Sequence, residues 1–240
     1  MIYPNKVMVI RAPLGIGYLS AYLKEAGHEF KLFDTTFVRC GDVPSDDALR
    51  EKNLQVVNPD FEKLGLVEKE IDVFKSLEDE IKSFKPDIIC ISTVDPNHIF
   101  GMELLRHCKK LVPDLPTICG GPLSTLVPED MIVEDCIDIV GRGETEEELV
   151  ELVNRYEKYG RDGWDKLYTV NNFWVKDKDY KINGIVHKNN VGLPNIDKGL
   201  APDLSIFDTR HFLRPMGGRM YNMATVIWTR GCVFRCSYCA

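Results

Sequence analysis

The amino-acid sequence predicts an α/β protein whose core is a doubly wound parallel sheet. Over residues 1–156, short apolar runs alternate with amphipathic segments of helical length. Several of the apolar runs end in loops of glycine and other small residues, as buried parallel strands commonly do. Strands that alternate with helices in this way form sheets that carry helices on both faces.

The composition and charge exclude several classes of protein. The chain has 240 residues, a formal net charge of -7 and 28% charged residues, which is ordinary for a globular protein. Lys and Arg are not clustered, so we expect no nucleic-acid partner and no membrane partner. The sequence shows neither a signal-peptide pattern nor an apolar run of about 18 residues, and we expect a cytoplasmic protein.

The first elements follow from hydrophobic periodicity. Residues 2–5 and 6–10 are alternative candidates for the first strand. Apolar side chains at helical spacing predict a helix over 18–26 that ends at Gly27, and a strand follows over 30–33. The next segment with a clear period lies beyond a long connection or insertion at 40–64.

A second amphipathic helix is predicted over residues 67–84. Its apolar residues are three or four positions apart and therefore share one helical face: Val67, Ile71, Phe74, Leu77, Ile81 and Phe84. The remaining strands and helices of the sheet alternate along the chain. Strands are predicted over 88–92, 117–119 and 137–140, and helices over 102–111, 128–133 and from Glu146 onwards.

The loops after three predicted strands are rich in small residues: Ser92 to Pro96, Gly120 to Pro122, and Gly141 to Glu144. In open α/β sheets ligands bind outside the carboxyl ends of the strands, where these loops meet. Glycine allows the backbone to approach a ligand closely. Each loop is also compatible with a tight turn that binds nothing, but the three together indicate a ligand site.

The regular alternation stops after residue 156. Residues 173–175 and 180–182 predict a β-hairpin within a connector over 157–224, and residues 225–228 predict a further strand. We therefore divide the chain into a domain over 1–156, the connector over 157–224, and the start of another unit over 225–240.

The eight cysteines fall into two groups. Five are scattered through apolar or helical stretches and are interpreted as core residues: Cys40, Cys90, Cys108, Cys119 and Cys136. The other three, Cys232, Cys236 and Cys239, have the spacing CxxxCxxC. Three thiolates can hold a 4Fe-4S cluster and leave one iron open. The alternatives are free thiols or a zinc site whose fourth ligand lies beyond Ala240 or is a histidine such as His211.

Two sets of motifs resemble one known family. Thr229-Arg230-Gly231-Cys232, the CxxxCxxC spacing and Tyr238 resemble the radical S-adenosylmethionine superfamily. Residues 12–28 and the loops at Gly120 and Gly141 resemble the Rossmann-like cobalamin-binding domain that precedes the radical domain in one subgroup. The resemblance covers almost the whole chain, and the cysteine motif is its most specific part.

The resemblance implies a cobalamin-dependent radical enzyme, most often a methyltransferase. It implies cobalamin, a 4Fe-4S cluster and S-adenosyl-L-methionine as cofactors, a small-molecule or peptide substrate and an external electron donor. Cys232, Cys236 and Cys239 correspond to the cluster ligands, and Tyr238 to the aromatic residue near the adenosyl group. The residues that correspond to the cobalamin contacts are Ser92, Thr93, Gly120, Gly121, Gly141 and Gly143.

The motif for a histidine below the cobalt is not matched, because Asp95 stands one residue too far from His98 and follows a different strand. Residues 225–240 correspond to the first strand and cluster loop of a truncated (β/α) barrel. We therefore expect the amino-terminal portion of a longer enzyme, which binds cobalamin without cleaving S-adenosylmethionine by itself. The alternative is a non-catalytic corrinoid- or nucleotide-binding module with a metal- or redox-active cysteine tail.

Overall fold

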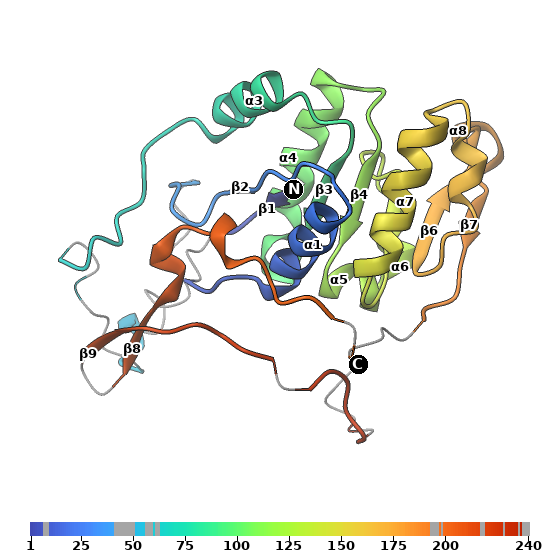
Figure 1. Cartoon of the computed structure of the whole chain (residues 1–240). Coiled ribbons are helices and arrows are strands. Elements are labelled where there is room, and N and C mark those ends of the chain that lie inside the picture. The colour runs from blue at the N-terminus through green and yellow to red at the C-terminus, as the bar shows by residue number, and fades with distance from the viewer. Residues whose placement is uncertain are drawn as a thin grey trace.

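The centre of the molecule is a seven-stranded sheet with the strand order β2-β1-β3-β4-β5-β6-β7 (Figure 1). The computed structural model describes residues 1–6, 10–40, 51–55, 60, 63–192, 197, 199–216, 219–227, 229–234 and 236. The first five strands are parallel, while β6 and β7 are antiparallel. The strands are β1 (Ile2–Tyr3), β2 (Phe33–Asp34), β3 (Ile89–Ser92), β4 (Thr117–Gly120), β5 (Ile139–Gly141), β6 (Phe173–Lys176) and β7 (Val186–Lys188).

Helices cover both faces of this sheet, which confirms the predicted doubly wound α/β class. One face packs against α1 and α7, and the other against α3, α4, α5 and α6. Successive residues of a strand point to opposite faces: Ile139 joins the core under α7, whereas Val140 joins the core under α4. The helices are α1 (Leu14–Glu25), α3 (Val73–Phe84), α4 (His98–Leu111), α5 (Pro122–Leu126), α6 (Pro128–Ile132), α7 (Glu146–Tyr159) and α8 (Tyr180–Asn183).

The helix predicted over 67–84 begins later, at Val73. The Asp72 carboxylate caps it by accepting hydrogen bonds from the backbone N–H groups of Phe74 and Lys75. Before this cap the chain is extended, and Lys69 forms a bridge with Val38. The prediction of a helix over 67–72 was wrong. The apolar residues keep helical spacing on both sides of Asp72, but Asp72 caps the helix and residues before it are not helical.

The predicted hairpin exists, but its returning strand was placed wrongly. Residues 180–182 lie in the short helix α8, and β7 pairs with β6 from Val186 onwards. The Asp177 carboxylate fixes this turn by accepting hydrogen bonds from Asp179 and Asn183. The hairpin continues the main sheet, because β6 pairs with β5. The domain boundary at residue 156 stays a prediction.

The C-terminal part forms a second, two-stranded sheet from β8 (Leu213–Met216) and β9 (Arg219–Asn222), which the sequence analysis did not predict. Residues 225–227 form no strand, against the prediction, because no described strand pairs with them. Of the two candidates for the first strand, residues 2–3 form β1, and residues 7–9 lie outside the described part.

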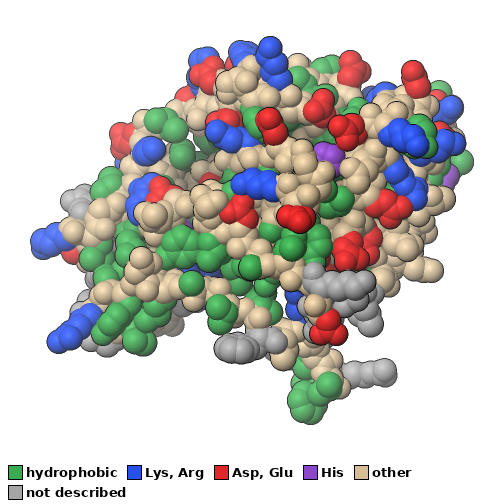
Figure 2. All heavy atoms as spheres, in the orientation of Figure 1, with side chains coloured by type: hydrophobic (Ala, Val, Ile, Leu, Met, Phe, Trp, Pro, Cys, Tyr) green, Lys and Arg blue, Asp and Glu red, His purple; other side chains and the backbone are tan. Residues whose placement is uncertain are grey.

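Exposed hydrophobic side chains gather on this C-terminal part, in the lower region of Figure 2, and include Met216, Val226, Val233 and Phe234. Among the helices that the structure describes, none combines the length and the apolar character needed to cross a membrane.

Candidate functional site

A cavity of about 190 Å³ lies between α1, α7 and the ends of β3, β4 and β5. The strand order reverses between β1 and β3, and such a switch point is where open α/β sheets bind ligands. The inner walls of the cavity are apolar, and its rim is made of glycines and a few polar groups. The lining includes Gly15, Tyr18, Leu19, Ile118, Leu149, Phe173, Glu144, Glu146, Ile227 and Arg230.

Five of the predicted site residues meet at this cavity: Ser92, Gly120, Gly121, Gly141 and Gly143. Gly121 has φ +96°, and a Cβ atom there would lie 2.7 Å from the carbonyl oxygen of Thr93. Its lack of a side chain is therefore needed for the two loops to pack. A Cβ atom on Gly120 would meet no protein atom within 4 Å. The space that a side chain at Gly120 would fill is therefore part of the cavity.

The Thr93 side chain does not line the cavity. It is fully buried, and its Oγ1 lies 3.7 Å from Sγ of Cys119 in the core. The backbone N–H of Thr93 donates to the carbonyl of Gly120 at 3.0 Å. Thr93 thus joins the loops after β3 and β4. That the predicted residues contact a ligand stays a prediction.

Arg230 forms one side of the rim. The sequence placed it in the motif before Cys232 but did not predict its position at the cavity. Its guanidinium donates to Oε1 of Glu146 at 2.7 Å, also pairs with Glu144, and lies 4.4 Å from the centre of the Tyr18 ring. Burial and the nearby charge of Glu146 raise the pKa of Glu144 above its usual range, and Arg230 opposes this. The segment that leads into Cys232 therefore contacts the rim of the cavity.

The predicted core position is confirmed for three of the five scattered cysteines, whereas Cys40 and Cys90 are only half-buried. Cys108, Cys119 and Cys136 are buried, and burial raises the pKa of Cys108 and of Cys136 to about 12. Such thiols remain protonated and are unreactive. Cys232 and Cys236 are exposed, whereas Cys239 and Tyr238 lie outside the described residues. The cluster site itself is therefore not described, and its ligands stay predicted.

Neither histidine considered in the sequence lies at the cavity. His98 begins α4, and its Nε2 is 4.0 Å from Glu134 on the α4 side of the sheet. His211 is fully buried, and its Nε2 is 2.6 Å from the Asp34 carboxylate. His211 is fully buried whereas Cys232 and Cys236 are exposed, so the structure gives no support to His211 as a fourth zinc ligand, although its Nδ1 has no hydrogen-bond partner among the described residues.

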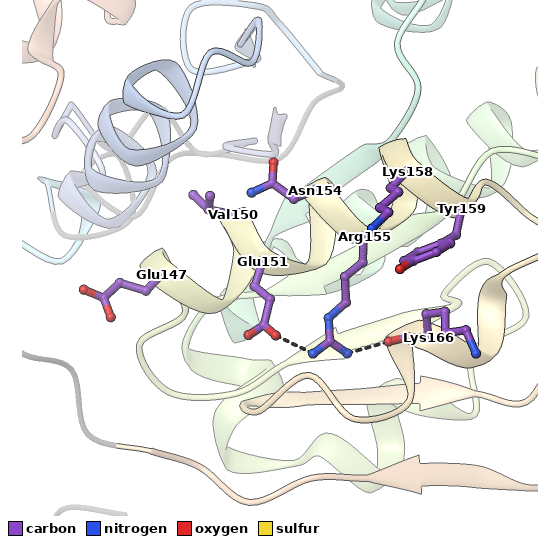
Figure 3. A pocket seen from close by; sticks show the side chains of 8 residues that line it. All are labelled: Glu147, Val150, Glu151, Asn154, Arg155, Lys158, Tyr159 and Lys166. Atoms are coloured by element: carbon purple, nitrogen blue, oxygen red, sulfur yellow. Dashed lines mark hydrogen bonds and ion pairs between the residues drawn. The ribbon is translucent and has the colours of Figure 1, made fainter.

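A second hollow lies on the outer face of α7 (Figure 3). Two of its charged groups pair with each other: the Arg155 guanidinium pairs with Glu151, and it also donates to the carbonyl oxygen of Lys166 at 2.6 Å. It has no glycine rim. Charged groups that satisfy each other on an open surface do not need a ligand, so the cavity on the α1 side of the sheet is the better candidate.

Comparison with known proteins identifies the first part of the chain. Residues 5–153 match the family model described as B12 binding domain. The chain is 27% identical over 176 residues to an anaerobic magnesium-protoporphyrin IX monomethyl ester cyclase of Cereibacter sphaeroides, and the match covers 69% of this chain and 26% of that protein. It is 24% identical over 248 residues to a hopanoid C-3 methylase of Methylococcus capsulatus, covering 98% of this chain and 37% of the methylase.

A solved structure shares the fold. The cobalamin-dependent S-adenosylmethionine radical enzyme OxsB, with aqua-cobalamin and S-adenosylmethionine bound, superposes with a TM-score of 0.60 at 18% identity. The match covers 85% of this chain and 24% of OxsB. The chain thus spans between 24% and 37% of the length of these three proteins.

Proposed function

Because the chain belongs to the B12 binding domain family, we propose that it binds cobalamin in the cavity between α1 and α7. We further propose that it is the cobalamin-binding and cluster-ligating portion of a cytoplasmic radical S-adenosylmethionine enzyme, in which it serves methyl transfer to a small-molecule or peptide substrate. The observation that carries the first proposal is the glycine rim above an apolar slot, at the switch point of the sheet.

The residues at this cavity fit a cobalamin. A corrinoid combines a broad ring that carries amide side chains with a nucleotide tail that ends in an apolar base. The apolar walls formed by Leu149 and Phe173 suit the base, and Gly120 allows a bulky ring to approach the backbone. The chain's own residues would therefore bind and orient the cofactor and exclude water from its buried side.

The proposal for the cluster rests on Cys232, Cys236 and Cys239 and on the contact of Arg230 with the cavity rim. When bound by three thiolates, a 4Fe-4S cluster supplies the electron for reductive cleavage of S-adenosylmethionine, and an external donor must reduce it. The relatives include two cyclases, one of which matches over 95% of this chain, and three proteins named as a methylase or methyltransferase, and the number of the latter favours methyl transfer.

Titration with hydroxocobalamin tests the binding proposal. We expect saturable binding of one cobalamin per chain, followed by the change in the cofactor's visible absorbance, and no comparable binding of a flavin or nicotinamide nucleotide. Tighter binding of such a nucleotide would favour the nucleotide-binding module instead. Absence of cobalamin binding by the folded chain would overturn the proposal.

A separate measurement tests the radical enzyme. We expect the 240-residue chain to bind cobalamin without cleaving S-adenosylmethionine, and a chain extended to the length of its relatives to cleave it after iron-sulfur reconstitution. Replacing Cys232, Cys236 and Cys239 by Ala in the extended chain should abolish both the iron-sulfur absorbance and cleavage. A well-folded extended chain that holds no cluster would contradict the enzyme proposal and support the module.

A further inference from the structure

One oxygen of Glu146 lines the cavity without a hydrogen bond partner. Glu146 is the first residue of α7, and its side chain is only 10% exposed. Its Oε1 accepts a hydrogen bond from Arg230 at 2.7 Å. Its Oε2 is buried, and none of the described residues hydrogen-bonds to it. Native proteins rarely leave a buried carboxylate oxygen in this state, so it requires an explanation.

The surroundings of Glu146 supply no second donor. The groups that face it are the Arg230 guanidinium, which is shared with Glu144, and the Glu144 carboxylate itself. Burial and the interaction with the Glu146 carboxyl group raise the pKa of Glu144, but Oε2 of Glu146 receives no hydrogen bond from Glu144. Arg230 donates to Oε1 of Glu146, so Oε2 is left as the acceptor of this side chain without a partner among the described residues.

The rest of the lining is made mostly of glycines and apolar side chains such as Leu149 and Phe173, and Gly120 leaves space there. Tyr18, Ser92 and Thr145 also line the cavity, but none of their hydroxyl groups hydrogen-bonds to Oε2 of Glu146. A molecule in the cavity is consequently the available source of a donor for Oε2. Cobalamin carries two kinds of donor, the amide N–H groups around the corrin ring and the ribose hydroxyl of the nucleotide tail.

We propose that Oε2 of Glu146 accepts a hydrogen bond from the bound corrinoid and is the polar group of this cavity that determines its specificity. The inference rests on the proposed function, because it takes cobalamin as the occupant. Arg230 acts through Glu146 as a positioning residue: it fixes Oε1 and so orients Oε2. Glu146 thereby connects the cavity to the segment that precedes Cys232.

The test compares two neighbouring glutamates of the same helix. Glu147 is exposed on the outer side of α7, so Glu147→Ala removes the same charge without touching the cavity. We expect Glu146→Ala to weaken hydroxocobalamin binding by about ten-fold or more, the value of one charge-assisted hydrogen bond. Glu147→Ala should bind like the unmodified chain. Circular dichroism shows whether each variant folds, and Glu146→Gln, which keeps the side-chain shape, carries the test if Glu146→Ala does not fold.

Cobinamide, which has the corrin ring without the nucleotide, identifies the donor. If the ribose hydroxyl donates, Glu146→Ala and the unmodified chain bind cobinamide equally. If a corrin amide donates, the loss persists with cobinamide, and either result supports the proposal. Equal hydroxocobalamin affinity of folded Glu146→Ala and Glu147→Ala would overturn it. Failure of the unmodified chain to bind hydroxocobalamin would instead reject the proposed function, so the two failures are distinguishable.

Discussion

The main sheet and the segment from residue 199 to β8 are held in place by different forces. The sheet is buried between two apolar cores, where Leu104 and Leu152 are fully buried. The later segment buries one large hydrophobic residue, Phe207, in a small cluster with Ala12 and Ile16. Leu204, Ile206 and Phe212 pack against this cluster but are only partly buried, and polar contacts add to them.

Polar contacts at Asp203 and His211 also attach this segment to the sheet domain. The Asp203 carboxylate accepts hydrogen bonds from Ser20 at 2.9 Å and from Lys24 at 2.7 Å, both on α1. His211 lies 2.6 Å from Asp34 at the end of β2. Apolar burial is insensitive to pH, whereas contacts of ionised groups are not. The difference implies that acid or a single polar substitution loosens the segment while the sheet remains folded.

Truncating the core of the sheet should have the largest effect on stability. Leu152 is in the middle of α7 and is completely buried. We expect Leu152→Ala to lower the free energy of unfolding by about 2–5 kcal/mol, through lost burial and the cavity that remains. Denaturant unfolding followed by circular dichroism measures this. Leu126→Ala, at an exposed leucine, is the control and should change little.

Removing the Asp203 carboxylate should have a smaller and more local effect. Asp203→Ala takes away the acceptor for Ser20 and Lys24, and we expect a loss of about 1–2 kcal/mol. Limited proteolysis should become faster within 199–212 and unchanged within α7. Asp162→Ala, at an exposed aspartate, serves as the control. Equal acceleration of cleavage in both regions would show that the segment is not separately attached.

Acid should loosen the same segment by a still smaller amount. The side-chain hydrogen bond from Arg210 lowers the pKa of Asp208 to about 2, although burial opposes this. An aspartate in the unfolded chain has a pKa of about 3.9. The contribution of Asp208 to the stability of the folded segment is therefore complete above about pH 4 and is lost as the pH falls toward about 2.

Hydrogen exchange detects this change. Between about pH 5 and pH 2.5, protection of residues 204–212 should fall relative to that of α7 after correction for the intrinsic exchange rate. The pKa of Asp203 is also lowered, because hydrogen bonds from Lys24, Ser205 and Ser20 outweigh burial, and it acts in the same direction. In the double variant with Asp203→Asn and Asp208→Asn, protection of residues 204–212 should depend much less on pH. A parallel loss of protection in α7 would contradict the comparison.

The contrast between the apolar sheet and the later segment also explains which elements the sequence predicted correctly. The parallel strands and the long helices were identified because apolar periodicity is local, and it reports the faces that become buried. The start of α3 was missed because Asp72 ends the extended segment within an apparently continuous helical pattern. The returning strand of the hairpin was misplaced because Tyr180 to Ile182 fits one helical turn as well as a strand.

The attachments of the later segment depend on residues that are distant in the sequence. Asp203 and Ser20 are 183 positions apart, and His211 and Asp34 are 177 positions apart. No local pattern encodes such pairs. At the cavity, the glycine loops were predicted because each follows a strand. The contact of Arg230 with Glu146 was not, because it depends on the path of the connector.

Substitutions at Gly120 test the central claim that the glycine rim of the sheet holds cobalamin. A Cβ atom there meets no protein atom within 4 Å, and Gly120 lines the cavity, so we expect Gly120→Ala to leave the melting temperature unchanged. We predict that Gly120→Ala weakens hydroxocobalamin binding and that Gly120→Leu weakens it by more than about ten-fold, in proportion to the space filled. A folded Gly120→Leu chain that binds hydroxocobalamin as tightly as the unmodified chain would contradict the account.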